Sequence, residues 1–213
     1  MTATILQSLD STIANVALPQ MQGALSASQE QMGWVLTSYI VAAAIMIPLS
    51  GWLANVIGKR TILLVSIVVF TLASVACGLA TNLAEIVLFR FIQGVGGAAL
   101  VPLSQAVLLD INEPRNYGRA MAIWAGAAQL GTICGPALGG WLTENLNWRW
   151  VFFINIPIGV LAFLGLLTYV DRRPGPRQRF DAMGFVTLSL ALVSLQLMLD
   201  RGFLASTLFY PTF

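Results

Sequence analysis

Long apolar stretches separated by short polar segments constrain the fold of this chain more than any other feature of its sequence. A helix of roughly 20 apolar residues crosses the hydrocarbon core of a bilayer. Backbone polar groups must pair internally in lipid, and the sequence lacks the alternating ten-residue segments of a membrane barrel, so an all-α polytopic helix bundle is predicted. We place the expected spans at Met1–Pro19, Met32–Ala54, Thr61–Ala80, Ile86–Leu109, Ala120–Leu142, Trp150–Val170 and Ala182–Leu199.

The composition agrees with a lipid-facing surface and argues against several classes of protein. Of the 213 residues, 57% are hydrophobic and 9% are charged, whereas soluble domains carry about 25% charged residues. The net charge of +2 gives no indication of a nucleic-acid partner. The sequence has no histidine, its cysteines Cys77 and Cys134 lie inside predicted spans, and it has no nucleophile–base or metal-ligand spacing. We therefore expect neither an enzyme nor a metal site.

The positive charges of the loops predict the orientation of the spans. Most of the 11 basic residues follow the second, fourth and sixth spans: Lys59, Arg60, Arg115, Arg119, Arg172, Arg173, Arg177 and Arg179. Because cytoplasmic loops are enriched in lysine and arginine, these loops and the N-terminus are expected on the cytoplasmic side of the cytoplasmic (inner) membrane.

A basic break that contains two prolines follows the sixth span. We expect a six-helix bundle at residues 1–170, a cytoplasmic linker at 171–181, and a seventh span with the start of an outer loop at 182–213. The first span begins at Met1 and the chain stops soon after the seventh span. The chain is therefore expected to be a truncated part of a longer protein.

Asp10 places a carboxyl group inside the first predicted span. If Pro19 marks the outer end of that helix, Asp10 lies about 13 Å deep by helical rise. Carboxylates inside membranes are costly and usually face a cavity or a partner, often as proton-binding sites. We interpret Asp10 as such a site. The alternative is an interfacial aspartate on a helix placed differently.

Arg90 is the basic residue that lies well inside a predicted span, and it begins a stripe of polar or small side chains. Members of this stripe recur at helical spacing: Arg90, Gly94, Gly97, Val101 and Ser104, with Gln93 and Gln105 beside it. Such a face indicates a water-lined interior. The residues expected to line a substrate path are Asn15, Gln93, Gly94, Gly97 and Gln105. The alternative is that Arg90 extends to the outer headgroups.

Asp10 and Arg90 are expected to meet. By helical rise alone, Arg90 lies about 7 Å and Asp10 about 13 Å below the outer surface, a difference that an arginine side chain can cover. Pairing favours the ionised carboxylate, and protonation weakens the pair. We therefore hypothesise a proton-coupling pair whose loosening frees the helices to shift.

Glycines repeat every four positions in the fifth span, a spacing that lets two helices approach closely. A proline in the same run removes one backbone donor and bends the helix. The residues expected to form a tight seam are Gly131, Gly135, Pro136, Gly139 and Gly140. In its functional version, this seam would seal a cavity against proton leak.

Gly51, Asn55, Gly58, Lys59 and Arg60 mark the expected cytoplasmic turn between the second and third spans. Glycines permit a sharp turn, and the basic pair favours the cytoplasmic interface. A simple turn with orienting charges explains this segment as well as a gating role does.

Several segments together resemble the major facilitator superfamily, and more narrowly its fourteen-span drug:proton antiporters of the EmrB/QacA type. The segments that carry the resemblance are Leu9–Pro19, Gly51–Arg60, Leu88–Ala99, Gly131–Gly140, Trp148–Gly159 and Leu199–Gly202. One departure is Asn55, where the family's loop motif usually carries an aspartate. Because an amide forms no ion pair, no charge relay is implied at this turn.

The resemblance implies the N-terminal six-helix half of such a transporter plus one extra span. It implies a proton-coupled exporter of amphipathic, often cationic drugs that works by alternating access, with Asp10 and Arg90 coupling protons. The energy source would be the proton motive force, with no cofactor. The implied partners are the lipid bilayer, small-molecule drugs and a missing C-terminal half. EmrB-type pumps can work with a periplasmic adaptor and an outer-membrane channel, whereas QacA-type pumps work alone, and the sequence does not distinguish the two.

Three alternatives stay open at this point. The first is another carrier of the superfamily, for a sugar or a metabolite, against which the glycine seam and the seventh span argue. The second is a polytopic membrane enzyme or structural subunit, which lacks any supporting constellation of residues. The third is that the chain is an inactive fragment.

Overall fold

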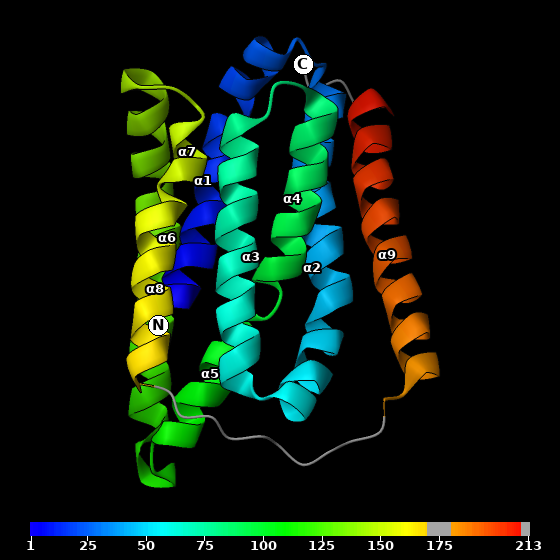
Figure 1. Cartoon of the computed structure of the whole chain (residues 1–213). Coiled ribbons are helices and arrows are strands. Elements are labelled where there is room, and N and C mark those ends of the chain that lie inside the picture. Colours follow the sequence, from blue (N-terminus) through cyan, green and yellow to red (C-terminus); the bar gives the residue numbers. More distant parts are fainter. Residues whose placement is uncertain (170–179, 210–213) are drawn as a thin grey trace.

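A computed structural model describes residues 1–169 and 180–209 of the chain, and every regular element in these ranges is a helix (Figure 1). The helices are α1 (Thr2–Leu25), α2 (Gln29–Ile57), α3 (Lys59–Leu79), α4 (Leu83–Gly97), α5 (Leu100–Ile111), the 3₁₀ helix η1 (Pro114–Asn116), α6 (Tyr117–Asn145), α7 (Trp150–Phe153), α8 (Asn155–Tyr169) and α9 (Ala182–Phe209). The expected all-α bundle is therefore confirmed.

Within residues 1–169 and 180–209, five helical stretches are long and apolar enough to cross a membrane, which indicates a multi-pass membrane protein. They are Gln29–Ile57, Lys59–Leu79, Leu83–Ile111, Pro114–Asn145 and Trp150–Thr168. The predicted first and seventh spans are also helical, as α1 and α9, but they are not among these five.

Pro19 does not end the first helix, contrary to our expectation. The helix α1 continues to Leu25 and ends at Ser26, whose φ of 50° lies in the left-handed region. Proline is tolerated inside membrane helices, where neighbouring helices and side chains satisfy the freed backbone groups. The division of the chain into bundle, linker and seventh span stays a prediction, and residues 170–179 lie outside the described residues.

Successive spans run in opposite directions, so the connections alternate between the two ends of the bundle (Figure 1). The α2–α3 turn and η1 lie at one end, while the α1–α2, α3–α4 and α6–α7 connections lie at the other. Helix α1 is packed against α6, α8 and α5, which makes it a central helix of the bundle. Helix α9 lies beside α2.

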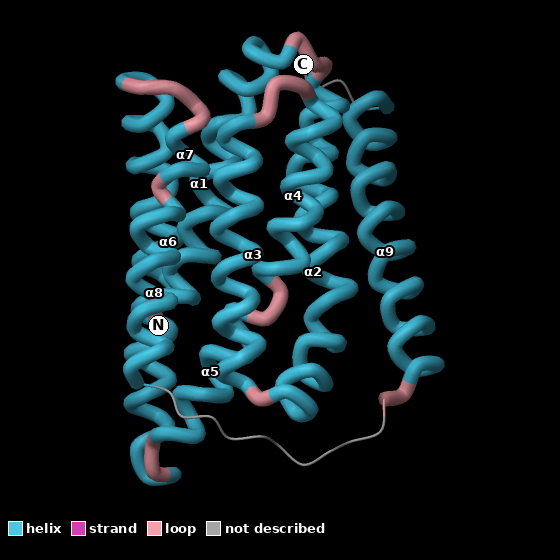
Figure 2. The backbone as a smooth tube through the Cα atoms, viewed as in Figure 1, coloured by secondary structure: helices cyan, strands magenta, loops and turns pink. Residues whose placement is uncertain are grey.

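Two of the spans are interrupted: Leu83–Ile111 near its middle, between α4 and α5, and Trp150–Thr168 near its start, between α7 and α8. Figure 2 shows both breaks as loops. The break between α4 and α5 includes Ala98, four residues before Pro102, and the break between α7 and α8 follows Phe153, four residues before Pro157. A proline cannot donate to the carbonyl four residues earlier, and its ring clashes with that carbonyl. These two prolines therefore account for the positions of the breaks.

The glycine repeat of α6 forms a close contact with α1. Gly131, Gly135 and Gly139 are buried, and a Cβ atom added to Gly131 would lie 2.9 Å from the Cβ of Ser8. A Cβ atom added to Gly135 would overlap Thr12, whose hydroxyl donates to the Gly131 carbonyl at 3.4 Å. The predicted seam thus exists as an α1–α6 contact.

Two of the residues expected in the seam lie outside it. Pro136 is exposed, and a Cβ atom added to Gly140 would meet nothing within 4 Å. Both residues fall between the positions that repeat every four residues, so they project away from α1.

The turn between α2 and α3 ties three helices together at one end of the bundle. Gly58 has a φ of 104°, a conformation that favours glycine. Lys59 pairs with Asp110 at the end of α5 (Nζ to Oδ2, 2.6 Å), and Arg60 donates to the carbonyl of Leu167 in α8 at 2.8 Å. Gly51 is exposed and Asn55 is half-buried. The predicted tight turn is confirmed, whereas a gating role stays a prediction.

The seam predicts opposite outcomes for two glycines of the same helix. Gly135→Ala sets a methyl group against Thr12, and overpacking of this kind costs about 1–3 kcal/mol. Gly140→Ala adds a methyl group in open space and gains helix propensity. We expect the detergent-solubilised Gly135→Ala protein to unfold at a lower temperature than the wild type, and the Gly140→Ala control to unfold at the same or a higher temperature. Equal losses in the two variants would contradict the seam.

Candidate functional site

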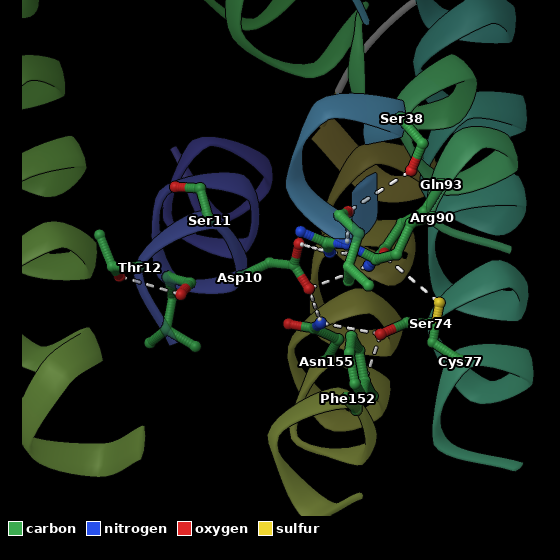
Figure 3. Close-up of polar contacts among 12 residues, drawn as sticks. Asp10, Ser11, Thr12, Ser38, Ser74, Cys77, Arg90, Gln93, Phe152 and Asn155 are labelled. Atoms are coloured by element: carbon green, nitrogen blue, oxygen red, sulfur yellow. Dashed lines mark hydrogen bonds and ion pairs between the residues drawn. The ribbon is translucent and has the colours of Figure 1, made fainter. Parts of the chain in front are cut away.

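A cluster of buried polar side chains lies where α1, α3, α4 and the α7–α8 break meet (Figure 3). We call it the Asp10 network. Its members are at most 1% exposed: Asp10, Ser74, Arg90, Gln93 and Asn155. Burial of an ion pair and two amides is costly unless each group finds hydrogen-bond partners.

The carboxylate of Asp10 accepts hydrogen bonds from three side chains. Its Oδ2 receives Arg90 Nη1 at 2.8 Å, and its Oδ1 receives Gln93 Nε2 at 2.9 Å and Asn155 Nδ2 at 2.6 Å. Charge-assisted hydrogen bonds of this kind favour the ionised carboxylate and are stronger than neutral ones. The site thus holds a negative charge inside the bundle by direct contacts.

The guanidinium of Arg90 is enclosed on several sides. Nη1 also donates to Gln93 Oε1 at 2.8 Å, and Nε donates to the carbonyl of Val35 at 3.4 Å. The guanidinium carbon lies 4.7 Å from the ring centre of Tyr39 and 5.8 Å from that of Phe152. Aromatic faces attract a desolvated cation, so α2 and α7 add to the binding of Arg90.

The network extends beyond the ion pair toward α3 and α7. Asn155 Nδ2 also donates to Ser74 Oγ at 2.9 Å, and this hydroxyl donates to the carbonyl of Phe152 at 2.9 Å. Cys77 Sγ lies 3.8 Å from Gln93 Oε1, within hydrogen-bond distance for sulfur. The charge state of Asp10 is therefore connected to the end of α7.

Local sequence explains why Asp10 and Arg90 point inward. Leu6, Asp10 and Ile13 recur at helical spacing on the buried face of α1. Figure 3 shows Asp10 pointing toward Arg90, while Thr12 points away from it. On α4, glycines let the neighbours approach, since a Cβ atom added to Gly97 would lie 2.8 Å from the hydroxyl of Tyr39.

The hypothesised contact between Asp10 and Arg90 is confirmed by the 2.8 Å distance between them. An interfacial aspartate and an arginine that extends to the headgroups are both excluded for this structure, because each residue is 1% exposed. The role of the pair in proton coupling stays a prediction.

The residues expected to line a substrate path do not share one surface. Gln93, Gly94 and Gly97 are buried, the first in the Asp10 network and the two glycines against α2 and α3. The expectation that these three face a water-lined interior does not hold in this structure, because close helix packing covers them. Asn15 is exposed and Gln105 is half-buried, so these two remain available to a path.

Sequence reasoning assigned no role to Asn155, Ser74 or Tyr39. Asn155 could have been found, since it is an amide in an apolar run and polar residues inside membranes usually carry a function. Ser74 and Tyr39 gave no comparable signal, because both residue types are ordinary in membrane helices and at their ends.

Comparisons with known proteins agree with this architecture. The Major Facilitator Superfamily model matches residues 1–213. The chain is 46% identical over 202 residues to the multidrug export protein EmrB of Escherichia coli K12, a match that covers 94% of this chain and 40% of that protein. EmrB of Haemophilus influenzae is 45% identical and the probable multidrug resistance protein EmrY of E. coli K12 is 41% identical, with the same coverage. The chain thus spans about two fifths of these curated relatives.

Solved structures with the same fold include transporters of xylose. The partially occluded, inward-open conformation of the xylose transporter XylE from E. coli superposes with a TM-score of 0.73 over 94% of this chain and 57% of that one, at 18% identity. A crystal structure of a D-xylose–proton symporter gives a TM-score of 0.71 over 97% of this chain and 53% of that one, also at 18% identity. Since the family model matches the chain from its first residue to its last, and the helix bundle has the fold of these transporters, this chain belongs to the Major Facilitator Superfamily.

Proposed function

We propose that this chain is the N-terminal half of a proton-coupled multidrug exporter. The observation that carries the proposal is the buried Asp10–Arg90 pair, in a chain 41–46% identical to proteins named for multidrug export or resistance. The superfamily consists of carriers rather than enzymes, so the network is interpreted as a proton site of a carrier. Because the chain spans about 40% of its relatives, a second helix bundle would supply the other wall of the substrate path.

In this proposal, Asp10 changes its partners when it changes its protonation state. The ionised carboxylate holds Arg90 and so ties α1 to α4. Proton uptake removes the negative charge and weakens this tie, which lets the bundle rock against its missing partner and alternate the access of the site. Release of the proton on the other side restores the pair. The proton motive force, rather than a cofactor, drives the cycle.

A sugar or metabolite carrier is the second candidate, and no specific observation favours it. The xylose transporters share the fold at 18% identity, a level at which the likeness carries no information on substrate. The relatives at 41–46% identity are named for drug export or resistance. We therefore propose amphipathic, often cationic drugs as substrates.

The proposed setting is the cytoplasmic (inner) membrane with the N-terminus in the cytoplasm. The basic residues at the α2–α3 turn and around η1 lie at one end of the bundle, as the positive-inside rule requires of cytoplasmic loops. The proposed partners are bilayer lipids, drugs and the second half of the transporter. A periplasmic adaptor and an outer-membrane channel, which the family resemblance implies, are further proposed partners to be tested by co-purification.

Replacement of the proton site is expected to abolish coupled export. Asp10→Asn keeps the size of the side chain but carries no ionisable group. In proteoliposomes that contain the product of the complete reading frame, this variant should bind drug and fail to accumulate it against its gradient under a proton gradient, whereas Asp10→Glu should retain part of the activity. Glu144→Gln is the matched control, since Glu144 is an exposed acid near the end of α6. Unchanged proton-driven export in Asp10→Asn would refute the proposal.

The stability of the pair can be separated from its role in coupling. Asp10→Asn leaves a buried guanidinium without a counter-charge, and loss of one partner of a buried pair costs about 3–5 kcal/mol. The double variant Asp10→Asn/Arg90→Gln removes both charges and should recover much of the thermal stability in detergent, but none of the proton-driven export. Recovery of export in the double variant would show that the charges serve folding alone.

A further inference from the structure

Asn155 contacts Asp10 from α8, at the same carboxylate oxygen that Gln93 of α4 contacts. It is the first residue of α8, directly after the break that Pro157 explains, and it is fully buried. Its Nδ2 lies 2.6 Å from Asp10 Oδ1 and 2.9 Å from Ser74 Oγ. The reverse orientation of the amide would set two oxygen atoms 2.6 Å apart, so the nitrogen must face an ionised Asp10.

The oxygen of the same amide has no partner. Asn155 Oδ1 is a buried side-chain atom without a hydrogen bond, whereas the nitrogen makes two. Buried polar atoms are nearly always paired, so an unpaired one needs an explanation. The unpaired Oδ1 of Asn155 could therefore accept a hydrogen bond when the neighbouring carboxyl group of Asp10 is protonated.

Protonation of Asp10 gives its carboxyl group an O–H donor, which requires a hydrogen-bond acceptor nearby. An ionised carboxylate only accepts hydrogen bonds, whereas a protonated one carries an O–H group that donates. All three side chains that face Asp10 present N–H groups to it. Gln93 Oε1 already accepts from Arg90 and lies within reach of Cys77. Among the three, the idle acceptor belongs to Asn155.

We propose that Asn155 is a positioning residue that responds to the protonation of Asp10: its amide donates to the ionised carboxylate and makes a half-turn to accept from the protonated one. This inference rests on the proposed function, in which Asp10 takes up a proton. The half-turn exchanges the positions of Nδ2 and Oδ1 about the terminal torsion, which has a broad, two-fold profile. One polar atom of Asn155 lacks a partner in either state, so the turn leaves no further atom of this side chain unpaired.

Ser74 transmits the half-turn to the backbone. In the present state its hydroxyl accepts from Asn155 Nδ2 and donates to the carbonyl of Phe152. Once Oδ1 faces Ser74, the hydroxyl hydrogen turns to donate to Oδ1 and leaves that carbonyl. Phe152 lies in the last turn of α7, beside the break. Proton uptake thereby loosens α7 from α3 at a place where the helix is already interrupted.

Among the residues that the structure describes, three other titratable groups interact with Asp10. Arg90 reaches it from α4, Tyr39 from α2 and Cys77 from α3. At the level of Asp10, α6 contacts α1 through Gly131 and Gly135, and the α7–α8 break contributes the amide of Asn155. The pH dependence of the site is therefore expected to follow Asp10, with Asn155 adjusting it.

The first test is the pH profile of export by the complete protein in proteoliposomes. Asn155→Leu keeps the number of side-chain heavy atoms and the branch at Cγ, and it removes both the donor and the acceptor. A charge-assisted hydrogen bond is about twice as strong as a neutral one. Loss of the Asn155 amide therefore destabilises the ionised form of Asp10 more than the protonated form. The midpoint of the pH profile of export should move to higher pH by about one unit. Asn145→Leu, at an exposed asparagine of α6, is the matched control and should keep the wild-type profile.

Ser74→Ala tests the connection to α7. It should move the midpoint less than Asn155→Leu does, and the double variant should behave as Asn155→Leu alone, since Ser74 acts through Asn155. A wild-type pH profile in Asn155→Leu, together with proton-driven export by the wild type, would overturn the inference and leave the proposed function intact.

The second test needs no transport and covers a variant that fails to fold. Infrared difference spectra between high and low pH, on wild-type protein with ¹³C-labelled asparagine, should show an amide carbonyl band that shifts together with the carboxyl band of Asp10. The amide band should be absent in Asp10→Asn. A carboxyl band without an accompanying asparagine band would overturn the amide half-turn. A coupled pair of bands in a protein that exports nothing would instead remove the proposed function and support the half-turn.

Discussion

The buried ion pair between Asp10 and Arg90 is the interaction on which the rest of the bundle depends. Two charges in a membrane interior are tolerated only when they pair and find further hydrogen bonds. Here Gln93 and Asn155 donate hydrogen bonds to the carboxylate. The guanidinium donates to the carbonyl of Val35 and lies over the ring of Tyr39. These partners come from α2, α4 and α8. The pair therefore determines how closely four helices must approach, rather than merely joining two of them.

Close approach of the helices is achieved by glycine and proline. On one side of α1, Gly131 and Gly135 bring α6 into contact with its backbone and side chains. On the other side, Gly94 and Gly97 admit α2 and α3 to α4. The interruption that Pro157 causes places Asn155 at the level of Asp10. Residues that weaken an isolated helix thus serve packing here, because lipid supplies no hydrophobic force between helices.

Much of this arrangement could be predicted from the sequence, and the remainder has identifiable reasons. The long apolar stretches specified the helices, and the cost of intramembrane charge specified that Asp10 and Arg90 would find each other. The expected end of the first helix at Pro19 was wrong, because a membrane helix can continue through a proline. Gln93 was expected on a water-lined face, since the polar stripe of α4 does not reveal whether water or another helix covers it. Ser74 depends on a contact between α3 and α7 that no local pattern encodes.

The anchoring of α3 at its first residues has a mechanical consequence. Lys59 and Arg60 fasten this end to α5 and α8, whereas Ser74 lies fifteen residues further along, roughly 22 Å away by helical rise. The far end of α3 is held as well, because Arg149 donates to the carbonyls of Gly78 and Ala80 at 2.7 and 2.6 Å. A proton that releases Ser74 would thus act between two fixed ends, where one small rotation of a hydroxyl group lets the middle of α3 bow while both ends stay in place.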